Sequence, residues 1–262
     1  MDLVELTQKG KKHTNYRHPW ESVRLRFIKN KLNHILPDVT LPYIFLDIGS
    51  GDTFLAKQLS ETYKNSQFHC VDIAFTDEQL KTFNLESGIN IAVYKSTNDL
   101  PLQSKDEIDV VLLLDVLEHI DADEAFLKSL NKLPNFSKKT NLLITVPAFQ
   151  SLFTQHDIIL GHYRRYTNNS LTKVLEHNQF LVEKKGYFFT SLLLPRFIEK
   201  QIESLKKNPS KETRVSSWSH GKIVTNLFSS ILICDNIVTN FLENLGVRII
   251  GLSNYAICKK KH

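Results

Sequence analysis

The stretch "YIFLDIGSGDTF" at residues 43–54 joins an apolar run to a loop that contains two glycines. The run at 43–47 predicts a buried β-strand, and the residues from Thr53 to Tyr63 predict a helix. Glycine at positions 49 and 51 lets the backbone turn tightly between these elements and approach a ligand closely. This order of strand, glycine loop and helix is typical of α/β proteins that bind a nucleotide-containing cofactor.

Further apolar runs continue the pattern along the chain. Strands are predicted at 68–73, 89–94, 107–115, 140–147 and 252–258, and a strand or strand pair at 180–189. Helical patterns lie between them, one opened by Asp121 and Glu124 at capping-box spacing and another capped by Thr167. Strands that alternate with helices predict a parallel sheet with helices on both faces, and ligands bind beyond the carboxyl ends of such strands.

Helical segments flank this core on both sides. An amphipathic pattern at 17–36 ends at Pro37, and two more patterns occupy 191–207 and 222–245. We therefore expect an N-terminal helical cap at 1–40, a core at 41–190, and a C-terminal helical lobe with a closing strand at 191–262. The apolar stripe of 222–245 predicts packing with 191–207 and the N-terminal helix. We expect these helices to cover the acceptor pocket, which is the part of the ligand site that holds the molecule to be modified. The alternative is shallow docking on a membrane, helped by the basic tail at 259–261.

Composition narrows the function classes. The net charge is +5, and the basic clusters near both ends predict a solvated rim or contact with an anionic partner. No nucleic-acid partner is expected, because no basic-aromatic recognition pattern is present. The scattered Cys70, Cys234 and Cys258 predict no metal site and a reducing, cytoplasmic setting, and the N-terminus lacks the apolar core of a signal peptide. The run "IVTNLFSSILIC" stops at Asp235, which predicts a segment too short to span a bilayer.

Two cofactor classes use a glycine loop of this kind. A dinucleotide site requires a small residue at the third glycine position, where this chain has the bulky Phe54. S-adenosylmethionine carries no pyrophosphate and tolerates a wider approach to the helix. Asp72 lies 25 residues beyond Asp47, at the end of the second predicted strand, where a carboxylate can accept both ribose hydroxyls. S-adenosylmethionine is therefore the favoured cofactor.

The segments "DIGSGDTFLAKQL", "VDIAF" and "LPLQSKDEIDVVLLLDVLEHI" resemble the class I S-adenosylmethionine-dependent methyltransferases across about residues 43–190. The resemblance implies a Rossmann-like sheet. "DVLEHI" is typical of members that act on small molecules, including those that methylate quinone precursors. A bacterial subgroup is similar in three further segments, "HPWESVRLR", "HDIILGHYRRYTNNSL" and "GLSNYAICKKK".

This resemblance implies roles for individual residues. Asp47 is expected near the methionine amino group, Gly49 and Gly51 under the cofactor, and Asp72 at the ribose. The other implied pocket residues are Asp115 at the cofactor, with His119, Trp20 and Arg24 at the acceptor. Thr53 stands where many members have a third glycine, and it should fit if its φ is negative. Ser96 stands where many relatives have an aspartate that faces the adenine.

The segment "HDIILGHYRRYT" at 156–167 leaves the fifth predicted strand where an acceptor must lie. We predict that His162 is the general base, with His156 as its rival. Arg164, Arg165 and Tyr166 are predicted to bind the acceptor, Arg164 and Arg165 through an anionic group. The alternative is that these residues fix the loop through contacts with one another and with neighbouring helices.

The sequence thus predicts a cytoplasmic methyltransferase that uses S-adenosylmethionine and methylates an oxygen of a small-molecule or lipid- or carrier-linked acceptor. Peripheral contact with a membrane is compatible with this prediction. Two alternatives remain, an NAD-type oxidoreductase and a protein that keeps the fold without turnover.

Overall fold

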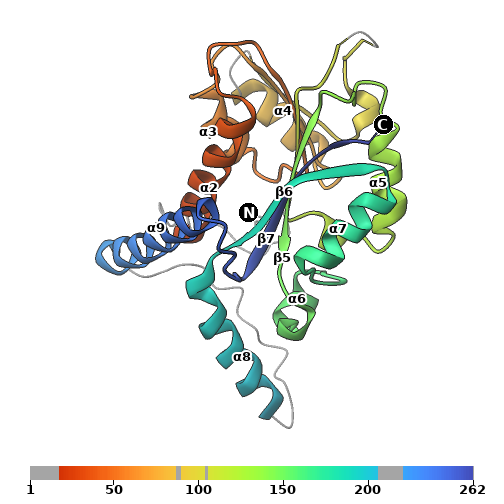
Figure 1. Cartoon of the computed structure of the whole chain (residues 1–262). Coiled ribbons are helices and arrows are strands. Elements are labelled where there is room, and N and C mark those ends of the chain that lie inside the picture. The colour runs from red at the N-terminus through yellow and green to blue at the C-terminus, as the bar shows by residue number, and fades with distance from the viewer. Residues whose placement is uncertain (1–17, 87–89, 104–105, 206–220, 262) are drawn as a thin grey trace.

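The computed structural model describes residues 18–86, 90–103, 106–205 and 221–261. These residues form a seven-stranded sheet in the order β3-β2-β1-β4-β5-β7-β6 (Figure 1). The strands are β1 Ile44–Ile48, β2 Gln67–Val71, β3 Ile91–Tyr94, β4 Val110–Leu114, β5 Asn141–Pro147, β6 Phe180–Phe188 and β7 Ser253–Lys260. The first five are parallel, and β7 runs antiparallel between β5 and β6.

Helices cover both faces of the sheet, as predicted. The helices are α2 Pro19–Ile35, α3 Phe54–Ser60, α4 Asp77–Glu86, α5 Asp123–Asn131, α6 Gln155–Ile159, α7 Asn168–His177, α8 Leu193–Leu205 and α9 Lys222–Asn244. Short 3-10 turns are η1 Thr97–Asp99, η2 Leu117–His119, η3 Gln150–Leu152 and η4 Thr190–Leu192. One apolar core lies between the sheet and α2, α3 and α9, and the other lies under α5 and α7. The central β4 is buried along its whole length, which explains its unbroken apolar run.

The structure overturns one local expectation, narrows a second and confirms a third. Helix α5 begins after Ala122 without a side-chain cap, because the carboxylate of Asp121 pairs with Arg164 instead of capping the helix. The segment at 180–189 contains one strand, β6, with an irregularity between Val182 and Lys184. The capping prediction for Thr167 is confirmed, because its hydroxyl accepts the backbone N–H of Ser170 at 3.1 Å.

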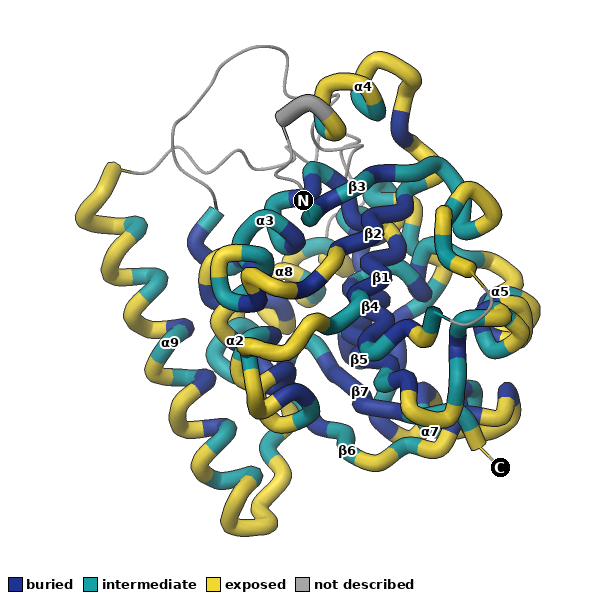
Figure 2. Tube along the Cα trace, turned by 90° about the horizontal axis from the view of Figure 1, so that it is seen from above, coloured by how far each residue is buried: buried dark blue, intermediate teal, exposed yellow. Residues whose placement is uncertain are grey.

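The C-terminal helix α9 confirms one part of its prediction, the packing on the N-terminal helix, and departs from another. It packs on α2, where Lys31 Nζ lies 2.8 Å from Glu243 Oε2 and 3.1 Å from Asn240 Oδ1. A cavity of about 640 Å³ lies at the carboxyl ends of β1, β2 and β4. Among the described residues, none from α8 or α9 lines this cavity, so the predicted lobe over the acceptor pocket is not formed. Figure 1 shows the two helices diverging from the sheet, and in Figure 2 α9 lies at the rim, mostly exposed or half-buried. The part of the expected N-terminal cap before His18 lies outside the described residues.

The length of α9 corrects a second expectation. The helix continues through Asp235 and reaches 23 residues. By length and composition alone it is long and apolar enough to cross a membrane. Asp235 lies within this helix, as the pattern at 222–245 predicted, and its Oδ2 accepts the Ser191 backbone N–H at 2.9 Å.

Candidate functional site

The cavity of about 640 Å³ lies at the carboxyl ends of β1, β2 and β4. Since the topology gathers these strand ends at one edge, residues distant in sequence meet there. Eight of the predicted site residues line this cavity: Trp20, Arg24, Gly49, Gly51, Asp72, Asp115, His119 and His162.

The glycine loop forms the floor of the cavity. Gly49 has a φ of +72°, and a Cβ added there would lie 2.4 Å from Val116 Cγ2, so both conformation and space require glycine. Thr53 has a φ of +60°, which contradicts the expected negative value. Left-handed backbone is costly for a β-branched residue, and the buried Thr53 hydroxyl also has no hydrogen-bond partner. The glycine loop is therefore strained at Thr53.

Asp72 connects this loop to the end of β2. Its Oδ2 accepts the Gly51 N–H at 3.0 Å, and its Oδ1 accepts the Ala74 N–H at 2.9 Å. The carboxylate thus fixes the glycine loop while it lines the cavity. This position beside the loop suits the acceptance of ribose hydroxyls.

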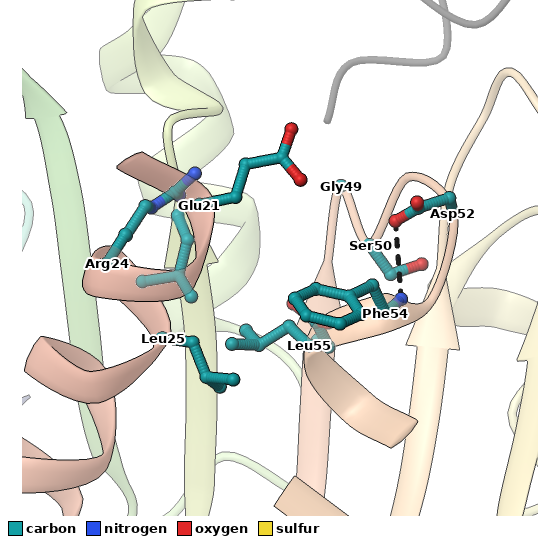
Figure 3. A pocket seen from close by; sticks show the side chains of 10 residues that line it. Glu21, Arg24, Leu25, Gly49, Ser50, Asp52, Phe54 and Leu55 are labelled. Atoms are coloured by element: carbon teal, nitrogen blue, oxygen red, sulfur yellow. Dashed lines mark hydrogen bonds between the residues drawn. The ribbon is translucent and has the colours of Figure 1, made fainter. Parts of the chain in front are cut away.

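Asp47 lines a smaller cavity of about 70 Å³ beside the main one. Figure 3 shows this smaller cavity between α2, which carries Arg24, and the glycine loop. The Oδ2 of Asp47 is buried without a hydrogen-bond partner. Burial raises the pKa of Asp47 to about 7, although the positive charge of Arg24 opposes this shift. A buried carboxylate oxygen without a partner is suited to receive a ligand's ammonium group.

This pKa predicts a pH dependence of cofactor binding. An ammonium group requires Asp47 ionised, and below pH 7 the carboxyl is increasingly protonated. S-adenosylmethionine affinity should therefore fall about tenfold from pH 7 to pH 5.5, a range in which an α-amino group stays charged. Calorimetry at several pH values measures this change, and Asp47→Asn should bind weakly with a flat profile. A flat profile in the unmodified protein would remove Asp47 from this role.

Arg24 of α2 meets Asp115 at the end of β4. Their charged groups lie 3.0 Å apart, and Thr145 Oγ1 also donates to Asp115 Oδ1 at 2.9 Å. The Arg24 guanidinium lies 5.6 Å from the ring centroid of Trp20, which brings the aromatic ring to the same wall. Asp115 itself has a φ of +56°, another strained position at the site. The N-terminal helix therefore closes one side of the cavity.

Glu118 is a cavity residue that the sequence analysis did not assign. It is 1 % exposed, and its Oε2 has no hydrogen-bond partner. Burial, with Asp115 nearby, raises the pKa of Glu118 well above its usual value. Glu118, His119 and His162 each offer one ligand atom, and these atoms lie within 4.8 Å of one another. Two histidines and a carboxylate could hold a divalent cation, although the sequence predicted no metal site. The sequence signal that could have identified Glu118 is its position next to His119 in the "DVLEHI" motif.

Asp157 organises the segment that follows β5. It is fully buried, and its Oδ1 lies 2.9 Å from His162 Nδ1 and 2.8 Å from Arg165 Nη2. Its Oδ2 lies 2.5 Å from Arg196 Nη2 of α8. Burial alone would raise the pKa of Asp157, but the hydrogen bond from His162 and the charge of Arg165 hold it well below its usual value. The contact of Asp157 with Nδ1 orients the His162 ring, so Nε2 is the ring nitrogen that this contact does not use.

The remaining predicted acceptor residues do not line this cavity. Arg164 pairs with Asp123 at 2.8 Å, and the Tyr166 hydroxyl donates to the same carboxylate at 2.7 Å. Arg165 is buried against Asp157, as described. His156, in α6, is not among the cavity residues either, and burial lowers its pKa. The structure therefore favours the loop-fixing alternative for Arg164, Arg165 and Tyr166. Ser96 caps η1 and is also absent from the cavity wall.

The parallel sheet with its antiparallel β7, the glycine loop and the cavity at the carboxyl ends of the strands define a Rossmann-like methyltransferase fold. The chain belongs to the methyltransferase domain family, whose model matches residues 16–185. A search of curated proteins returns no match.

Solved structures of similar fold include several methyltransferases at low sequence identity. A protein proposed to be a sarcosine dimethylglycine methyltransferase from Galdieria sulphuraria is 13 % identical with a TM-score of 0.55, over 91 % of this chain and 85 % of that one. Phosphoethanolamine N-methyltransferase 2 of Haemonchus contortus, solved with S-adenosyl-L-methionine, is 16 % identical with a TM-score of 0.54, over 90 % of this chain and 53 % of that one. The [4+2]-cyclase SpnF is 10 % identical with a TM-score of 0.51, over 90 % and 80 %. At these identities the likeness establishes the fold, and the cyclase illustrates that one fold hosts different reactions.

Proposed function

We propose that this protein transfers a methyl group from S-adenosylmethionine to an oxygen of a small-molecule or lipid- or carrier-linked acceptor. The observation that carries the proposal is that one cavity contains both the glycine loop with Asp72 and the oriented His162. The family match and the methyltransferase folds above support methyl transfer in general. The "DVLEHI" motif supports placing the chain in the branch that acts on small molecules.

The residues around the glycine loop fit S-adenosylmethionine in three respects. Asp47 offers a buried carboxylate oxygen to an ammonium group, and Asp72 offers a carboxylate beside the loop. At Gly49 the backbone comes close enough to Val116 to exclude any side chain. Phe54 borders the smaller cavity, where a dinucleotide site would need a small residue. These features disfavour the NAD alternative.

The main cavity also contains a side chain that can take the proton of a hydroxyl acceptor, His162. S-adenosylmethionine supplies an electrophilic methyl on a sulfonium. The acceptor oxygen forms a bond to the methyl carbon as the carbon–sulfur bond breaks, and the hydroxyl proton passes to His162. Asp157 fixes the orientation of the His162 ring, in the manner of a base oriented by a third group. The walls formed by Trp20 and Ile120 limit where the acceptor can lie, and such positioning lowers the barrier further.

Replacing Asp72 should weaken cofactor binding. Asp72→Ala removes the predicted acceptor of the ribose hydroxyls and the partner of the Gly51 N–H. Leaving such polar groups unpaired costs about 1–3 kcal/mol, so the dissociation constant for S-adenosylmethionine should rise about 5- to 150-fold in calorimetry. Asp77→Ala is the matched control, because Asp77 lies on the exposed start of α4, where it pairs with the surface residue Lys95. Equal affinity in a folded Asp72→Ala variant would refute the assignment.

Two measurements test the function as a whole. Calorimetric titration with S-adenosylmethionine and with NAD should give binding of the first only, and the reverse result would favour an oxidoreductase. Incubation with methyl-labelled S-adenosylmethionine and a panel of phenolic and lipid-linked hydroxyl acceptors should release S-adenosylhomocysteine and label one acceptor. Tight cofactor binding without labelling of any hydroxyl acceptor would contradict oxygen methylation.

A further inference from the structure

The exposed face of α9 is apolar. Its inward face carries polar side chains around Leu232, which is fully buried in the core. Side chains that are 49–85 % exposed run along and just after this helix, including Ile223, Leu227, Ile237, Phe241 and Leu245. Polar side chains occupy the face toward the protein. Asp235 bonds Ser191, while Asn240 and Glu243 bond the buried Lys31.

Helix α8 is inverted in the same way. Toward the protein, Arg196 pairs with Asp157, Lys200 Nζ donates to the Phe153 carbonyl, and Glu203 accepts the Gln155 N–H at 2.7 Å. Toward solvent lie side chains that are 49–82 % exposed: Leu194, Phe197, Ile198, Ile202 and Leu205. In water a surface helix turns its apolar stripe inward, so this pattern in two helices indicates an apolar medium outside them.

The polar contacts decide how α9 can meet that medium. The 23 residues of α9 are long enough to cross a bilayer. A crossing helix would lose the hydrogen bonds of Asp235, Asn240 and Glu243 and would place these polar side chains in hydrocarbon. A helix that keeps these contacts can lie only along the membrane surface, with its exposed stripe in the boundary between headgroups and acyl chains.

The charges of this surface complement anionic lipid. Both acidic side chains of α9, Asp235 and Glu243, turn inward. Exposed cations stand near both ends of the helix, Lys222 at its start and Arg248 shortly after its end. By sequence, residues 206–220 between the two helices carry four Lys or Arg against one Glu. Basic residues that border an apolar helical face are typical of binding to anionic membranes.

We infer that the outward faces of α8 and α9 dock this protein on the surface of an anionic bilayer. The surface is linked to the proposed site, because Arg196 of α8 and His162 of the cavity bind the same Asp157 carboxylate. Docking does not depend on methyl transfer. The choice of acceptor does rest on the proposed function: an acceptor that resides in the membrane would enter the cavity beside α8, which favours a lipid-linked acceptor over a freely soluble one.

Vesicle co-sedimentation of the full chain without cofactor or acceptor tests the docking. The protein should sediment with vesicles that contain about 30 % phosphatidylglycerol in phosphatidylcholine, and about 0.5 M salt should weaken this binding. The double variant Leu227→Gln with Phe241→Gln should lower the partition coefficient about tenfold, and so should Phe197→Gln with Ile202→Gln. The matched control, Leu41→Gln with Leu181→Gln, changes exposed apolar residues elsewhere and should bind like the unmodified protein.

The outcomes separate docking from its alternatives. All variants must retain S-adenosylmethionine binding, which keeps a failure of docking distinct from a failure of the proposed function. Equal sedimentation of the α9 and α8 variants and the control would overturn the inference. So would an absence of vesicle binding with a concentration-dependent dimer in light scattering that these variants convert to a monomer, because a second copy of the chain would then cover the surface.

Discussion

Replacing His162 with glutamine should lower turnover about 10²- to 10⁴-fold and leave S-adenosylmethionine affinity nearly unchanged, because a positioned base contributes a rate factor of that size. Glutamine keeps a polar side chain of similar reach but cannot take a proton from a hydroxyl. The structure supports this choice because His162 lines the cavity and Asp157 lies 2.9 Å from its Nδ1. Turnover is measured as S-adenosylhomocysteine release with the acceptor labelled in the panel above, and affinity by calorimetry.

His156→Gln is the matched control, since this histidine lies six positions earlier and does not line the cavity. It should retain turnover within about twofold, far from the loss expected for a base. A second arm adds EDTA to the unmodified protein. Turnover that survives EDTA supports a proton acceptor, whereas its loss and recovery with a divalent cation would make His162 a metal ligand with Glu118 and His119. Normal turnover of His162→Gln would exclude both roles.

Replacing Asp157 with alanine should lower the free energy of unfolding by about 3–5 kcal/mol, the usual cost of leaving a buried charge without its partner. Two guanidinium groups, those of Arg165 and Arg196, pair with this one carboxylate, and all three side chains are less than 10 % exposed. Arg196 also pairs with Glu199, which is half-exposed. The same pairing makes stability pH-dependent. Since the folded pKa of Asp157 is lowered, its contribution is present above the ordinary carboxyl pKa of about 4 and is lost as pH falls.

Urea unfolding followed by circular dichroism measures this loss. Asp121→Ala is the matched control, because Asp121 also pairs with an arginine but is 77 % exposed, and its loss should cost less than about 1 kcal/mol. If the alanine variant does not fold, Asp157→Asn keeps the side-chain volume and one acceptor oxygen, and should show an intermediate loss. A cost below about 1 kcal/mol in either Asp157 variant would contradict the central role of this carboxylate.

The sequence alone determined the architecture of the core and the cofactor edge of the site. Apolar runs and glycine positions are local signals. A few adjacent apolar residues indicate a central strand that is buried on both faces, and a glycine indicates a possible left-handed turn. The β1 loop with Gly49 and Gly51, and Asp72 at the end of β2, could therefore be placed from their positions along the chain. The order of alternating strands and helices then brought these residues to one edge of the sheet.

Only the tertiary structure decided which charged side chains face the cavity. Arg24 contacts Asp115 and Thr145 across long sequence separations. Asp157 binds two arginines and a histidine, side chains of the kinds that could each have bound an acceptor. No local spacing encodes such choices, because they depend on which partners the packed elements leave within reach. The 3.6-residue period of α9 likewise shows that one face is apolar but not which face turns inward. That orientation follows from Lys31 and Ser191, whose polar groups hold the polar side of the helix against the protein.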